Sequence, residues 1–143
     1  LGSLELHSYL VTLEDGMKLL IWAGMPPLEQ ANRLRGMTPA IAFVHCSPKI
    51  IFDDFAQMIR AMNAKIVIPH HCDGAPGTFK MRAAIMKARG EDYYDRFVDK
   101  ETGLFIEEKY MEALDQEIKK VCPTSGLRLL EHHRWYHFGL VLE

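Results

Sequence analysis

The chain has 143 residues and a net charge of −2 at neutral pH, with ordinary apolar (48%) and charged (25%) fractions. Its length suits one domain with one core, and its nearly balanced charge argues against nucleic acid or an anionic membrane as a partner. No apolar run approaches the ~20 residues that cross a bilayer, and no signal peptide is recognisable. Three cysteines without a disulfide-framework spacing predict reduced thiols and a cytoplasmic location.

Both ends of the sequence predict a piece of a longer protein. The first residue is Leu1 rather than Met, and strand-like sequence follows almost at once. Leu142 and Glu143 are typical of the remnant of an expression tag. We therefore expect residues 1–141 to form a single domain that belongs to a larger protein.

The first predicted element is a β-hairpin. Residues 6–13 are rich in β-forming side chains, and residues 18–23 form a second such run after the turn signal Glu-Asp-Gly. Pro27 can then open a short helix, which Gly36 closes.

A strand–helix–strand unit follows. Residues 40–46 and 65–69 are short apolar runs, typical of strands that are covered on both faces. Between them, residues 49–63 carry apolar side chains at helical spacing, with two aspartates near the favourable end of the helix dipole. Such a unit makes its two strands parallel neighbours in one sheet.

Helical patterns dominate the remainder of the chain. Residues 79–89 and 104–121 predict helices, and the acidic segment 91–95 between them predicts a solvated turn. Residues 127–141 predict one or two closing strands. The expected fold class is therefore α/β of an α+β sandwich type, with a mixed β-sheet flanked by helices.

The residues of greatest chemical interest are His70, His71, Cys72 and Asp73, which directly follow the strand at 65–69. The carboxyl ends of parallel strands meet at one edge of a sheet, where ligands bind. Imidazole and thiolate are good Zn²⁺ ligands, whereas a carboxylate suits harder ions or bridging roles. The cluster is therefore a candidate metal or catalytic site, and spacing alone leaves ordinary packed or hydrogen-bonded roles open beside it.

His45 and Cys46 end the preceding strand in the same way, so neighbouring strands about 4.8 Å apart could bring them into the same pocket. Here the packed role is the favoured interpretation. His132, His133 and His137, in the closing strand region, are expected at the surface.

The order hairpin, helix, strand, helix, "KIVIPHHCDG", helices and terminal strand resembles the carboxyl-terminal half of a metallo-β-lactamase-fold hydrolase of the lactonase-like branch. In that family the corresponding strand ends in a motif hVIPxH, whose histidine is a metal ligand. Pro69-His70-His71 matches this motif, and His71 aligns with the ligand. The segments "SYLVTLEDGMKLLIWAG" and "LRLLEHHRWYHF" are similar to the family's mid-chain hairpin and its closing strand.

The resemblance implies half of an αββα sandwich, with one sheet, its helices and an exposed apolar sheet face. Its implied partners are the amino-terminal half of the same protein and a small-molecule substrate, with homo-oligomerisation through the sheet face as a further possibility. The implied cofactor is a divalent metal, Zn²⁺ in the first place, with Mn²⁺ or Fe²⁺ as alternatives.

Two departures from the family pattern bear on activity. The signature H-x-H-x-D-H, which belongs to the amino-terminal half, is absent, and Met25 stands where much of the family has a metal-bridging aspartate. Catalytic zinc sites use about three protein ligands, so one histidine cannot hold the ion firmly. The isolated chain is therefore expected to be inactive, and it can be metal-free.

Two functional hypotheses follow from the sequence. In the first, the chain is part of a metal-dependent hydrolase acting on an ester, lactone, amide or phosphoester, with His71 as metal ligand and His70 and Asp73 as catalytic orienters or proton shuttles. In the second, it is a small α/β metal-binding or protein-interaction module without catalysis.

Overall fold

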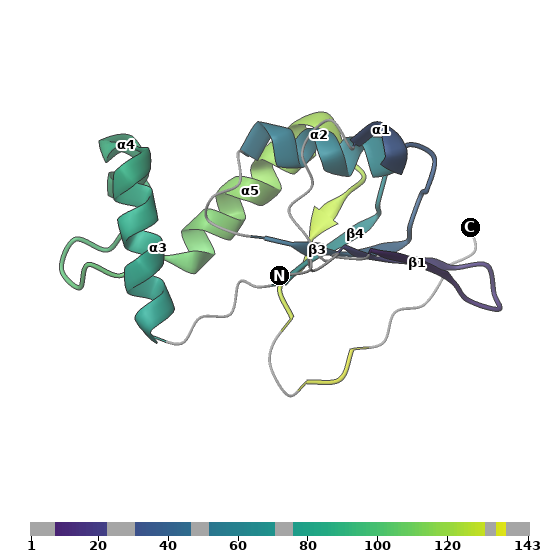
Figure 1. Ribbon diagram of the computed structural model, residues 1–143, viewed down its shortest axis with the longest axis horizontal. Coiled ribbons are helices and arrows are strands. Elements are labelled where there is room, and N and C mark those ends of the chain that lie inside the picture. The colour runs from purple at the N-terminus through teal and green to yellow at the C-terminus, as the bar shows by residue number, and fades with distance from the viewer. Residues whose placement is uncertain (1–7, 23–30, 47–51, 71–75, 131–133, 137–143) are drawn as a thin grey trace, which may run out of the picture.

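The computed structural model describes residues 8–22, 31–46, 52–70, 76–130 and 134–136. In this part of the chain, helices lie against one face of a single β-sheet (Figure 1). The elements in chain order are β1 (Tyr9–Thr12), β2 (Lys18–Trp22), α1 (Ala31–Leu34), β3 (Ile41–His45), α2 (Phe52–Met62), β4 (Ile66–His70), α3 (Pro76–Arg89), α4 (Glu91–Phe97), α5 (Glu107–Val121) and β5 (Gly126–Leu127).

The strands lie side by side in the order in which they occur in the chain. β1 and β2 pair antiparallel as a hairpin, whereas β2–β3, β3–β4 and β4–β5 are parallel pairs. The predicted hairpin and the predicted parallel strand–helix–strand unit are both confirmed. The described residues therefore form a mixed α/β fold with a five-stranded sheet, as expected.

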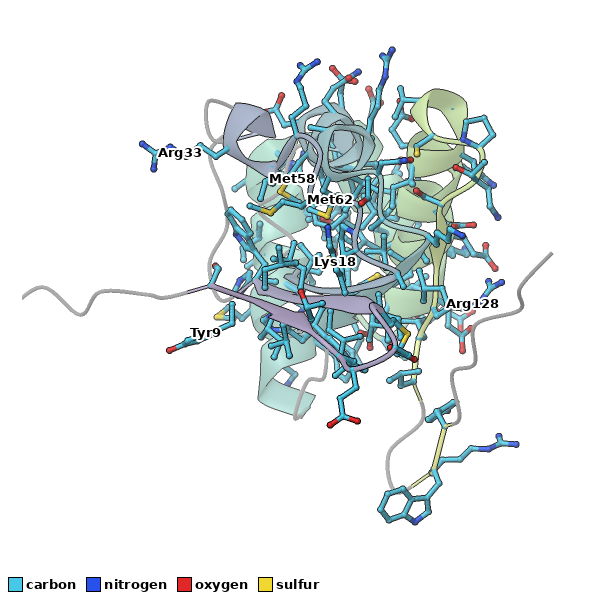
Figure 2. The ribbon with its side chains drawn as sticks, turned by 90° about the vertical axis from the view of Figure 1, so that its right-hand side faces the viewer. Tyr9, Lys18, Arg33, Met58, Met62 and Arg128 are labelled. Carbon is cyan, nitrogen blue, oxygen red and sulfur yellow. The ribbon has the colours of Figure 1, made fainter. Side chains whose placement is uncertain are left out.

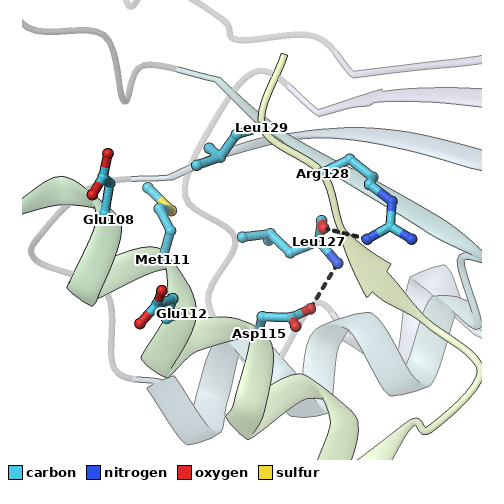
Figure 3. Close-up of a pocket in the computed structure, with 7 residues that line it drawn as sticks. All are labelled: Glu108, Met111, Glu112, Asp115, Leu127, Arg128 and Leu129. Carbon is cyan, nitrogen blue, oxygen red and sulfur yellow. Dashed lines mark hydrogen bonds between the residues drawn. The ribbon is translucent and has the colours of Figure 1, made fainter. Parts of the chain in front are cut away.

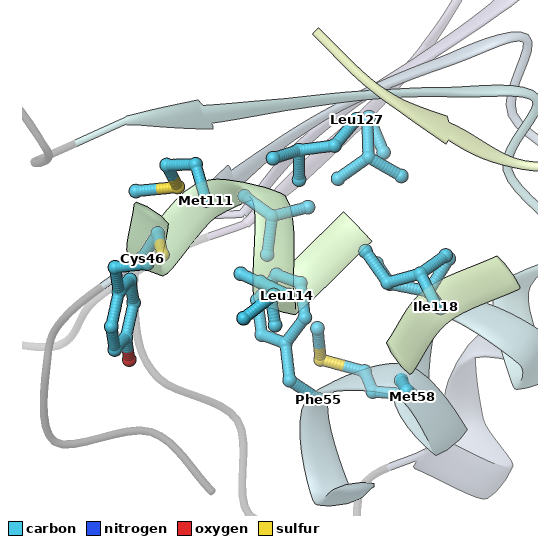
Figure 4. Close-up of a cluster of buried hydrophobic side chains, with 14 of the residues drawn as sticks. Cys46, Phe55, Met58, Met111, Leu114, Ile118 and Leu127 are labelled. Carbon is cyan, nitrogen blue, oxygen red and sulfur yellow. The ribbon is translucent and has the colours of Figure 1, made fainter. Parts of the chain in front are cut away.

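The side chains on one face of the sheet belong to the hydrophobic core. Leu20, Ala42, Val67 and Leu127 lie in register across four strands, and all four belong to the buried core cluster. Side chains alternate between the two faces of a strand, so this row faces the helices. Figure 4 shows Leu127 at the sheet side of a cluster whose other members include Leu114 and Ile118 of α5 and Phe55 and Met58 of α2.

The two principal helices bury the faces that their sequences predict. In α2 the buried side chains are Phe55, Ala56, Met58, Ile59 and Met62, and Asp53 and Asp54 occupy the first turn. Carboxylates there favour the positive end of the helix dipole. In α5 the stripe of Tyr110, Leu114 and Ile118 is buried against the rest of the core.

The helices α3 and α4 project beyond the end of the sheet (Figure 1). The prediction of a solvated turn over 91–95 is wrong, because these residues belong to α4. Tertiary packing explains the helix. Phe97 is fully buried, with its ring centroid 5.3 Å from that of Tyr110, and Tyr93 and Tyr94 are half-buried against the core.

Among the described residues, the predicted closing strand is confirmed only at its start. β5 contains only two residues, and neither 128–130 nor 134–136 is in a strand. His132, His133, His137, Leu142 and Glu143 lie outside the described residues. None of the described helices is long and apolar enough to span a bilayer.

The face of the sheet turned away from the helices is apolar and partly uncovered. Tyr9, Ile21, Phe43 and Ile68 lie in register across it, and we call this the open face. Tyr9 remains 58% exposed and Ile21 43% exposed. Figure 2 shows Tyr9 pointing away from the body of the molecule. An exposed apolar sheet face is one of the features that the resemblance described above implies.

Candidate functional site at the strand ends

His45 and His70 meet at the carboxyl edge of the parallel strands β3 and β4. They are direct partners in the strand register, and their ring centroids lie 5.6 Å apart at an interplanar angle of 85°. Val44 and Val67 point into the core. By alternation, both histidines therefore belong to the open face. The sequence predicted this meeting of two strand ends.

A backbone hydrogen bond fixes the ring of His70. Its Nε2 lies 2.8 Å from the carbonyl oxygen of Trp22, at the end of β2. A carbonyl oxygen only accepts hydrogen bonds, so Nε2 carries the hydrogen and donates it. In the neutral imidazole, Nδ1 is then the nitrogen with the lone pair. The side chain of His70 thus reaches across the end of β3 and ties three strand ends together.

Cys46 does not join the two histidines. Its side chain is 1% exposed and belongs to the core cluster on the helix side of the sheet (Figure 4). Its backbone N–H donates to the carbonyl oxygen of His70 over 2.9 Å, which extends the ladder between β3 and β4. Cys46 is therefore a packed core residue, as the favoured interpretation of the sequence has it.

The remaining predicted site residues lie outside the described part of the chain. These are His71, Cys72 and Asp73, and also Met25. β4 ends at His70, so His71 is the next residue after the carboxyl edge of the sheet. Among the described residues, no group of three or more His, Cys, Asp or Glu side chains could hold a metal ion. The described donors at this edge are two imidazoles, a donor type that suits Zn²⁺.

A second concave site, which sequence reasoning missed, lies between α5 and β5 (Figure 3). It is a groove of about 380 Å³ lined by Glu108, Met111, Glu112, Asp115, Leu127, Arg128 and Leu129. The Leu127 N–H donates to Oδ1 of Asp115 over 2.9 Å, which holds β5 against the helix. Carboxylates at positions 108, 112 and 115 follow helical spacing, and this is the signal that could have revealed the groove.

Comparisons with protein-family models, curated proteins and solved structures give no match. The class that the fold itself defines is a mixed α/β protein, with two histidines at the carboxyl edge of its sheet.

Proposed function

We propose that the chain is the carboxyl-terminal part of a metal-dependent hydrolase of metallo-β-lactamase fold. Its substrate would be an ester, lactone, amide or phosphoester. The observation that carries the proposal is the pair His45 and His70 on the open face, at the carboxyl edge of parallel strands. Ligands of open α/β sheets bind at this edge.

In this proposal, His71 is a metal ligand, and His70 and Asp73 orient the reacting groups. A bound divalent metal supplies a water molecule whose pKa is lowered to about 7. His70 contributes a fixed ring, because its hydrogen bond to the Trp22 carbonyl oxygen selects the tautomer with the hydrogen on Nε2. The other metal ligands would come from the amino-terminal half, which would also cover the open face.

The test uses the full-length protein, with bound metal and hydrolysis of generic ester and phosphodiester substrates as the two measurements. His71→Ala should lose both the metal and the turnover. His70→Ala should keep most of the metal and lower turnover by about 10–100-fold, because it removes a group that orients the site. The matched control is His132→Ala, which should change neither.

Two outcomes would contradict this function. One is a full-length protein whose hydrolysis does not depend on metal or on His71. The other is turnover by residues 1–143 alone that His71→Ala abolishes, since half a site should be inactive.

A second candidate function, a non-catalytic interaction module, is favoured by the exposed apolar side chains of Tyr9, Val11 and Ile21. Monomeric soluble proteins rarely expose large contiguous apolar patches without a binding role. In this case His71→Ala would alter only stability. If the module instead binds a metal, it should carry about one Zn²⁺ per chain, and Cys72→Ser should lose that ion.

A further inference from the structure

The outer face of α3 is basic and apolar. Lys80, Met81, Ala84, Lys87 and Ala88 are exposed, whereas Arg82, Ala83 and Met86 on the other side of the helix are buried. α3 contains no acidic residue. Because α3 and α4 project beyond the sheet, the described part of the chain leaves this outer face uncovered (Figure 1). The outer face of α3 therefore carries the cations Lys80 and Lys87 beside the apolar side chains of Met81, Ala84 and Ala88.

The groove between α5 and β5 has a net negative charge, because its lining contains three carboxylates and one cation, Arg128. Glu108 and Glu112 are exposed, and neither forms an ion pair with any described residue. The side chains of Met111, Leu127 and Leu129 supply its apolar lining (Figure 3). Leu129 is 49% exposed, whereas Met111 and Leu127 are buried, so Leu129 supplies most of the accessible apolar surface of the groove.

The two surfaces also match in spacing. Lys80 and Lys87 are seven residues apart, which places them on one side of α3 about 10.5 Å apart along the axis. Glu108 and Asp115 have the same separation along α5, with Glu112 between them. The Asp115 carboxylate already pairs with Lys119 and accepts the Leu127 N–H, so Glu108 and Glu112 are the carboxylates left for the two ammonium groups. Met81 and Ala84 can then lie against the apolar lining.

We propose that the α5–β5 groove binds α3 of a second copy of this chain. The mode is a helix laid in a groove, with apolar anchors at helical spacing and charges at the rim. The chain itself carries a helix of the required charge, spacing and accessibility, which is why a second copy is the occupant. Since the contact joins two different surfaces, it either closes reciprocally as a pair or continues as an open chain. It is independent of the metal and of the hydrolase function.

Sedimentation velocity of residues 1–143 over a concentration series tests the proposal. We expect the mass to rise with concentration at low salt. Lys80→Gln with Lys87→Gln, or Glu108→Gln with Glu112→Gln, should each weaken the association by roughly tenfold, and added salt should weaken it similarly. The matched control neutralises Lys100 and Lys120, two exposed lysines outside the helix face, and should leave the association unchanged.

A mixing experiment makes the test specific for the two surfaces. The lysine variant keeps an intact groove, and the glutamate variant keeps an intact α3. At a concentration where each variant alone is monomeric, an equimolar mixture should form a one-to-one complex.

Three results would overturn the proposal. They are a chain that stays monomeric at all concentrations, an association that neither double variant weakens, and an association that is lost only in Val11→Lys. The last result would place the contact at β1 instead.

Discussion

Asp99 shows how a single side chain shapes the link between α4 and α5. Its Oδ1 accepts hydrogen bonds from the backbone N–H of Thr102 at 2.7 Å, from the Thr102 hydroxyl at 2.9 Å and from the N–H of Glu101 at 3.0 Å. These bonds, the Thr102 backbone N–H first, hold the pKa of Asp99 below its ordinary value of 3.8. The turn also contains Gly103 at a φ of +66°, a conformation that glycine adopts without strain.

We expect Asp99→Asn to lower the free energy of unfolding at neutral pH. A carboxyl group with a depressed pKa in the folded state stabilises the protein above its unfolded pKa, and this contribution is lost as the pH falls through the folded pKa. The difference in the free energy of unfolding between the wild type and Asp99→Asn should therefore become smaller as the pH falls below 3.8. Urea unfolding at several pH values measures it. Glu112→Gln, at an exposed position in the middle of α5, is the control, and a pH-independent difference for Asp99→Asn would contradict the account.

The candidate site shows which residue contacts a sequence can predict. The position of His70 beside His45 follows from two apolar strands that end alike and pair in parallel. Its hydrogen bond to the Trp22 carbonyl could not be predicted, because it joins a side chain to a backbone oxygen 48 residues away. The inward direction of Cys46 follows from alternation once the exact end of β3 is known, but strand ends are the least predictable feature of a pattern.

At the scale of elements, Ser125 connects two loops that are distant in the chain. The residue is 2% exposed, and its hydroxyl donates a hydrogen bond to the carbonyl oxygen of Ala64, between α2 and β4. The next residue continues the contact, since the Gly126 N–H donates to the Lys65 carbonyl over 3.1 Å. Ser125 therefore aligns β5 with the amino end of β4.

Ser125→Ala should lower the free energy of unfolding by about 1–3 kcal/mol, because it leaves a buried carbonyl oxygen without its donor. Chemical denaturation of residues 1–143 measures the change. Thr124→Ala, at an exposed neighbouring position, should stay within about 0.5 kcal/mol of wild type. Equal stability of the two variants would show that the Ser125 hydrogen bond contributes nothing.

The helices also show which elements the periodicity of apolar residues can predict. α2 and α5 have strong apolar stripes, and both were predictable. α4 was not, because its short acidic sequence carries a turn-like pattern and the helix depends on packing of Phe97, Tyr93 and Tyr94 against the core. Here tertiary packing outweighs local sequence preference.

At the scale of the whole molecule, the two faces of the sheet differ in what covers them. Helices cover one face, while Ile21 on the open face is 43% exposed. The proposed function assigns the amino-terminal half of the protein to that face, and homo-oligomerisation through it remains the alternative partner. Ile68 on this face is already 3% exposed, whereas an exposed apolar side chain such as Ile21 contributes fully only once its cover is present.

Ile21→Thr tests this cover while keeping a β-branched side chain in the strand. In residues 1–143 alone the free energy of unfolding should change by less than about 1 kcal/mol. In the full-length protein it should fall by about 1–3 kcal/mol, because the side chain would be buried there. Thermal or urea unfolding of both forms measures the contrast. Gln116→Ala, at an exposed position of α5, should not change the free energy of unfolding of either form. If Ile21→Thr also leaves the full-length protein unchanged, no partner covers the open face there.

The agreement between strand order in the sheet and strand order in the chain has a consequence for biosynthesis. Each new strand that leaves the ribosome finds its only earlier neighbour already synthesised. No strand has to be inserted later between two strands that are already paired. The sheet can therefore grow at one edge as translation proceeds. The steps from β1 to β4 join strands that are close in the chain, and such local connectivity favours rapid folding, whereas β5 reaches β4 only after residues 71–125 have been synthesised.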